Sequence, residues 1–230
     1  MRQLIAAALI AAFPASAGAA DRALSITSFE RVRVEGPYDV RVTIGRPPAA
    51  RANGDARALD ALDLRVEGTT LIVRGRATSD APRSAPGRPV VVTVATPRLT
   101  AANLNGGGAL AIAGPLTGQR VDLSVNGAGT LTATGVAADQ LNATLIGSGT
   151  LTLAGRAQRA LIVASGAGVT AAEKLTVGDL TVRQEGSGTL ATAARFTATG
   201  SSSGLGAITV TGAPACTIRA LGGGTVRCGR

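Results

Sequence analysis

The sequence of 230 residues contains no histidine and no tryptophan, and only 3 Phe and 1 Tyr. Without histidine the chain has neither the serine and cysteine triads that depend on it, nor a His-ligated zinc site, nor the commonest general acid and base. With so few aromatic rings, the core must be built from Ala, Val, Leu, Ile and Thr. Such a core is thin, repetitive and layered.

Lysine is also nearly absent, because every basic residue except Lys174 is an arginine. The chain has 23 basic and 14 acidic residues, for a formal charge of +9. Basic proteins that follow a phosphate backbone carry basic runs with interleaved aromatic residues. Here the arginines are scattered singly, so we predict a solvated basic surface and no nucleic-acid partner.

Residues 1–20 have the three parts of a Sec-type signal peptide. They comprise a charged start, an apolar run at residues 4–13, and small residues up to Ala20 that provide Ala-x-Ala cleavage sites. The apolar run is too short for a permanent membrane anchor, and no second long apolar stretch follows. We expect a cleaved signal peptide, a periplasmic or secreted mature protein, and no transmembrane segment.

A Gly-x-Gly motif returns seven times between residues 99 and 230, at intervals of 18 to 21 residues. Its first glycines are Gly106, Gly127, Gly147, Gly166, Gly186, Gly204 and Gly222. Repeats of this length, with no helical period, are too short for propeller blades and are typical of the coils of a parallel β-solenoid. Each Gly-x-Gly would form a sharp corner in which glycine permits a positive φ.

Aligned on these corners, the repeats alternate apolar and polar residues, as half-buried strands do. Leu131 and Leu151 occupy an inward column, whereas Thr130, Thr132, Thr150 and Thr152 lie in outward columns. We therefore predict an all-β fold, a parallel β-helix (β-solenoid) of about seven coils. The four threonines would form a flat grid of hydroxyl and methyl groups, a candidate surface for ice or a crystalline polymer; Thr is also simply favoured in strands.

The amino-terminal third lacks the repeat. Residues 29–34 and 38–44 alternate like strands, residues 55–62 suggest a short helical turn, and residues 64–66 and 71–73 predict a β-hairpin. We expect residues 21–98 to form a β cap that contains this hairpin. Residues 99–230 would form the solenoid, and the two parts would make one continuous domain. The cap would cover the open end of the solenoid, which otherwise exposes unpaired backbone.

Several of these segments together resemble a known family. The residues that carry the resemblance are Phe29, Val32, Val34, Gly36, Asp39, Val40 and Val42, then Leu64, Val66, Glu67, Gly68, Leu71 and Val73, and the serial Gly-Ala-Gly and Gly-Ser-Gly-Thr-Leu corners. They are similar to the family called "putative auto-transporter adhesin, head GIN domain", over about residues 26–229. The resemblance implies a bacterial, exported β-solenoid, with no catalytic residues to transfer.

Enzymes built on parallel β-helices, such as polysaccharide lyases and hydrolases, need clustered carboxylates. The acidic residues of the repeats, Asp122, Asp139, Glu173, Asp179 and Glu185, stand at different offsets from their corners and form no ladder. The same scatter argues against calcium sites. We therefore expect no enzymatic activity, no metal and no other cofactor.

The two cysteines, Cys216 and Cys228, stand six residues before and six after Gly222, both in inward columns. In an exported chain such a pair is more often bridged than free, so we predict a disulfide that closes the last coil. The alternative is two buried free thiols, since facing sheets lie about 10 Å apart.

Two functions fit these observations. The first is a non-enzymatic, exported structural or adhesive module of the bacterial cell envelope, monomeric or weakly associated, whose partner is an envelope, glycan or surface ligand. The second is a carbohydrate-active or glycan-binding envelope protein. The absence of histidine and of an acidic cluster favours the first.

Overall fold

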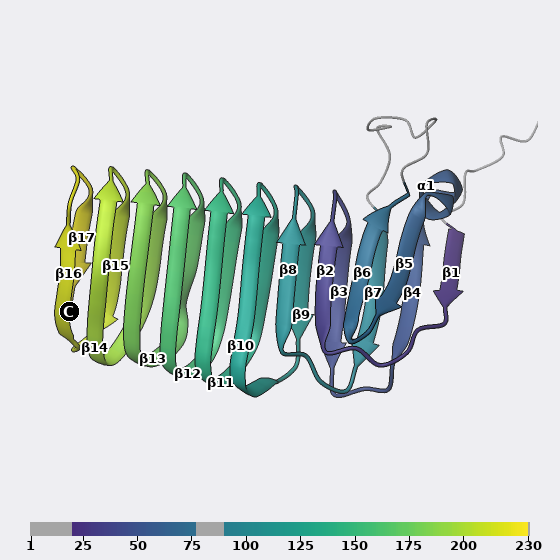
Figure 1. Cartoon of the computed structure of the whole chain (residues 1–230), viewed down its shortest axis with the longest axis horizontal. Coiled ribbons are helices and arrows are strands. Elements are labelled where there is room, and N and C mark those ends of the chain that lie inside the picture. Colours follow the sequence, from purple (N-terminus) through teal and green to yellow (C-terminus); the bar gives the residue numbers. More distant parts are fainter. Residues whose placement is uncertain (1–19, 77–89, 230) are drawn as a thin grey trace, which may run out of the picture.

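The structure, a computed structural model, describes residues 20–76 and 90–229. The predicted signal peptide lies outside these residues, except for Ala20, which begins the first strand. The fold is 75% strand and 3% helix. Figure 1 shows the strands stacked side by side along one long axis, with β16 and β17 at one end and β1, β5 and α1 at the other.

The bounds of the elements are as follows. The amino-terminal elements are β1 (Ala20–Leu24), β2 (Arg31–Glu35), β3 (Asp39–Ile44), β4 (Ala49–Gly54), α1 (Ala56–Asp60), β5 (Leu62–Glu67), β6 (Thr70–Gly75) and β7 (Val91–Thr96). The repeats contain β8 (Ala101–Asn105), β9 (Ala109–Ala113), β10 (Leu116–Gly127), β11 (Thr130–Gly147), β12 (Thr150–Gly166), β13 (Val169–Gly186), β14 (Thr189–Gly204), β15 (Ala207–Gly212), β16 (Ala215–Ala220) and β17 (Thr225–Cys228).

Strands of successive repeats pair in parallel, and the predicted β-solenoid is confirmed. One face, called the Thr face below, contains β7, β3, β9, the first parts of β11 to β14, β15 and β17. The other, called the Asn face, contains β6, β2, β8, the last parts of β10 to β14, and β16. The solenoid has about six turns, slightly fewer than the seven predicted coils, because seven corners enclose six complete turns.

The two glycines of each corner serve different purposes. In the first six corners the first glycine has a positive φ, for example 121° at Gly127, a conformation that residues with a side chain rarely adopt. The second is required by close packing, because a Cβ on Gly129 would lie 2.7 Å from both Gly108 O and Leu104 Cδ2 of the preceding coil.

The core is a single cluster that runs along the axis between the faces, and its side chains are aliphatic except for Phe29 near the amino-terminal end. Leu131 and Leu151 are fully buried, whereas Thr130 is exposed and Thr150 half-buried, so the predicted alternation is correct. Because each inward residue stacks on its equivalents in the neighbouring coils, the repeat produces continuous apolar packing without aromatic rings.

The amino-terminal third joins the stack out of chain order. β2 and β3 pair in parallel with β8 and β9 on one side and with β6 and β7 on the other. The predicted hairpin is confirmed as antiparallel β5 and β6, with Val66 opposite Leu71. β4 and β1 extend the Thr face in antiparallel fashion beyond β7. Parallel stacking thus continues from the repeats into residues that we expected to form only a cap.

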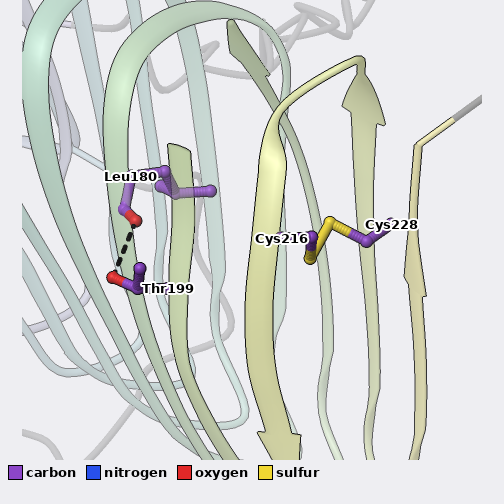
Figure 2. Close-up of a disulfide and its surroundings, with 4 residues drawn as sticks. All are labelled: Leu180, Thr199, Cys216 and Cys228. Carbon is purple, nitrogen blue, oxygen red and sulfur yellow. Dashed lines mark hydrogen bonds between the residues drawn. A yellow bond between two sulfur atoms is a disulfide. The ribbon is translucent and has the colours of Figure 1, made fainter. Parts of the chain in front are cut away.

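The predicted disulfide between Cys216 and Cys228 is present, with a Cα–Cα distance of 6.4 Å. Figure 2 shows it joining the last two strands, near Leu180 and Thr199 of the preceding coils. Cys216 pairs with the buried Ala198, and Cys228 with the buried Val210. Both cysteines therefore lie in inward columns, as predicted, although no further coil formed by the described residues covers them.

Candidate functional site

The four threonines singled out in the sequence lie together on the Thr face. Thr130 pairs with Thr150, and Thr132 with Thr152, on adjacent strands. The register places Ala109 and Ala111 on one side of them and Val169 and Ala171 on the other. The grid is therefore only the centre of a larger surface of small outward residues.

This surface, called the Thr/Ala patch below, extends over six successive strands from β9 to β15. Its twelve members are Ala109, Ala111, Thr130, Thr132, Thr150, Thr152, Val169, Ala171, Thr189, Ala191, Ala207 and Thr209. None is charged and none is buried. At about 4.8 Å per strand, the six strands span roughly 24 Å.

Charged residues begin where the patch ends. In the column that contains Thr132, the strand before β9 contributes Arg41 and the strand after β15 contributes Arg227. The chain carries 23 basic residues, yet none of them occupies any of the twelve positions of the patch. The patch therefore differs chemically from the rest of the solenoid surface. The patch is flat, since every outward side chain on it is small.

The Asn face carries a second feature that the sequence analysis missed, a shallow depression of about 260 Å³ with both polar and apolar lining residues. Its polar lining residues are Arg31, Arg33, Thr70, Asn103, Asp122, Ser124, Asn142 and Thr144. They come from β6, β2, β8, β10 and β11, which the register places side by side. The depression forms because the small Ala101 lies between Arg31 and Asp122 in one outward column.

Hydrogen bonds hold one side of the depression in place. Asn103 Nδ2 donates to Ser124 Oγ at 2.5 Å, and Asn142 Nδ2 donates to Asp122 Oδ1 at 2.6 Å. Arg120 Nε also donates to Asp122 Oδ1, at 3.1 Å. Asn103 Oδ1 is buried and has no hydrogen-bond partner among the described residues. A second pair, Asn126 Nδ2 to Asn105 Oδ1 at 3.0 Å, continues the amide ladder toward the corner.

The carboxylates of the repeats are as dispersed in the structure as in the sequence. Asp122 lies on the Asn face, whereas Asp139 and Asp179 accept hydrogen bonds from Gln158 and Thr197 on the side between the two faces. In the part of the chain that the structure describes, no three His, Cys, Asp or Glu side chains group in a way that could hold a metal ion.

Residues 28–214 match the family model described as "Putative auto-transporter adhesin, head GIN domain". The chain belongs to this family. The resemblance inferred from the corners and the strands near Val32 and Leu71 is therefore confirmed. No curated protein matches the chain.

Several solved structures of other proteins share the fold. A "putative adhesin" from Bacteroides fragilis superposes with a TM-score of 0.84 at 21% identity, over 92% of this chain and 97% of that one. A "putative lipid binding protein" from Parabacteroides distasonis gives 0.73 at 18% identity, over 91% and 96%. A "putative adhesin" from Parabacteroides merdae gives 0.67 at 17% identity, over 91% and 95%. At these identities the likeness establishes the fold alone.

No helix within residues 20–76 and 90–229 is long and apolar enough to cross a membrane.

Proposed function

We propose that this head GIN domain protein is an exported, non-enzymatic adhesive module of the cell envelope, and that the Thr/Ala patch is its adhesive surface. The observation that carries the proposal is the uncharged, flat and periodic character of the patch over six strands. The fitting partner is an ordered, uncharged polymer surface, such as a crystalline polysaccharide.

The chemistry of the patch supports such a partner. Its methyl groups release water at little cost, and its threonine hydroxyls can donate and accept hydrogen bonds in a regular row. A rigid solenoid presents these groups without ordering a loop, so binding loses little conformational entropy. Each contact is weak, but twelve side chains in register would act together.

Export is supported by the disulfide. Bridges of this kind form and persist in oxidising compartments and are rare in the cytosol. Cys216 and Cys228 are joined at the end of the solenoid, which fits the periplasmic or secreted location that the amino-terminal residues predict. A location outside the cytoplasm is also where an adhesive surface would meet its ligand.

A binding assay on insoluble polymers tests the proposal. The purified protein is mixed with crystalline cellulose, chitin and ice, and the bound fraction is measured after sedimentation or, for ice, after slow freezing. The variant Thr132→Lys/Thr152→Lys places two charges at the centre of the patch and should reduce binding at least tenfold.

The matched control is Thr181→Lys/Thr199→Lys. These two exposed threonines are also paired in register, but on the Asn face, so the same change in net charge leaves the patch intact. Equal loss of binding in both variants, or no binding of the unmodified protein to any ordered surface, would overturn the proposal.

A further inference from the structure

The depression on the Asn face joins two chemically different walls. One wall contains the guanidinium groups of Arg31 and Arg33 on β2, and the other contains Asp122 and Asn142 on β10 and β11. Ala101 on β8 separates them as a low floor. Two strand spacings place the backbones of Arg31 and Asp122 roughly 9.6 Å apart, a gap that one pyranose ring with its substituents can bridge.

The first wall is prepared for a carboxylate. Arg31 is exposed and makes no ion pair with any described residue, and Arg33 reaches only Glu35, at 4.0 Å. A guanidinium can hold a carboxylate through two parallel hydrogen bonds. Two such groups, two residues apart on one strand, point to an anionic group on the ligand at this side.

The opposite wall is prepared for hydroxyl groups. Asp122 accepts hydrogen bonds through its Oδ1 from Asn142 and Arg120, and its Oδ2 has no hydrogen-bond donor among the described residues. A ligand hydroxyl can donate to this carboxylate oxygen, and Asn103, which lines the floor beside Arg33 and donates one amide hydrogen to Ser124, can donate its second amide hydrogen to another hydroxyl. The negative charge of the Asp122 carboxylate would also repel a ligand that is negatively charged along its whole length, such as a polyphosphate.

We infer that the depression is a binding site for an acidic saccharide, with the sugar carboxylate at Arg31 and Arg33 and ring hydroxyls at Asn103 and Asp122. The volume of about 260 Å³ lies just below that of pockets for drug-sized ligands and suits a single sugar residue. Leu161 and Val163 follow Asn142 and Thr144 in the outward columns, so the polar surface ends there and the site accepts a short segment of a glycan.

This site is on the face opposite the Thr/Ala patch, so it does not depend on the proposed adhesive surface. With this site the protein would bind an acidic glycan on one face and an uncharged polymer surface on the other. The site also gives the glycan-binding alternative a definite place in the fold.

Calorimetric titration with trigalacturonate tests the site, and its methyl ester serves as the uncharged probe. We expect trigalacturonate to bind and the ester to bind at least tenfold more weakly, because a charge-assisted bidentate contact is lost. Arg31→Gln and, separately, Arg33→Gln should each weaken binding of trigalacturonate about tenfold or more, and Asn103→Ala should weaken it a few-fold.

The control variant is Arg183→Gln, which removes an exposed arginine from the same face several strands away. It should bind trigalacturonate as the unmodified protein does. Thr132→Lys/Thr152→Lys should also bind trigalacturonate normally, and this result would show that the site acts independently of the Thr/Ala patch. The inference would be overturned if trigalacturonate did not bind, or if its methyl ester or inorganic phosphate bound equally tightly. It would also be overturned if Arg31→Gln and Arg33→Gln bound trigalacturonate as tightly as the unmodified protein does.

Discussion

Cys216 and Cys228 join the two strands of the last coil across the core, with their Cα atoms 6.4 Å apart. Within residues 20–76 and 90–229 no coil follows β17 to cover this end of the solenoid, and Cys216 is exposed although it lies in an inward column. In a stack where each coil contacts only its neighbours, a terminal coil frays first. The bridge therefore acts where the fold is weakest.

We predict that Cys216→Ser/Cys228→Ser loosens the last coil without unfolding the rest. A closed loop with a sequence separation of 12 contributes about 3 kcal/mol in the chain-entropy model, so amide exchange in β16 and β17 should accelerate up to about 100-fold. Exchange in β11 to β13 should stay unchanged. Reduction of the unmodified protein provides the control and should give the same pattern; unchanged protection of β16 would contradict the role assigned to the bridge.

A second prediction concerns the three consecutive glycines at the first corner. A Cβ on Gly108 would lie 2.5 Å from Tyr38 O and 2.7 Å from Gly36 O, whereas a Cβ on Gly107 meets nothing within 4 Å. Gly108→Ala should therefore lower the free energy of unfolding by about 2 kcal/mol or more. Gly107→Ala should change it by less than about 0.5 kcal/mol. Urea unfolding of the two variants measures the difference, and equal effects would show that the corner can relax.

The repeats were predictable because one signal appears in every coil. Leu131 and Leu151 alternate with Thr130 and Thr150 at period two, and the corner glycines set the register between coils. The same logic located Cys216 and Cys228, since positions at equal distances from Gly222 face each other across the corner. Local pattern and global fold agree at these residues, so sequence reasoning is reliable there.

The amino-terminal order was not predictable in the same way. The alternation of Val32 with exposed arginines would look the same whether its strand paired with the strand of Leu71 or with that of Ala102. In the structure Val32 pairs with both residues, one on each side. Hydrophobic alternation determines which face a residue takes, but it does not say which strand lies beside it. The depression depends on this order, because Arg31 meets Ala101 only through pairing across 70 positions of the chain.

The two sides of a strand should respond very differently to charge. Leu151 is fully buried and stacks between Leu131 and Thr170, so Leu151→Asp would place an unpaired charge in the core at a cost of several kcal/mol. Thr130→Asp, at an exposed position one coil earlier, should cost about 0.5 kcal/mol. The midpoints of thermal unfolding measure both effects. Similar losses in the two variants would show that the assignment of faces is wrong.

The last coils contain buried polar groups that weaken the stack. Thr192 is fully buried, its Oγ1 has no hydrogen-bond partner among the described residues, and its neighbours in register are Ala172 and Val210. Valine has nearly the same shape without the hydroxyl, so Thr192→Val should raise the free energy of unfolding by about 1 kcal/mol. Thr209→Val, at an exposed position of the Thr/Ala patch, is the control and should have little effect. Urea unfolding followed by circular dichroism compares the two, and a lower midpoint for Thr192→Val would mean that the hydroxyl has a partner inside the core.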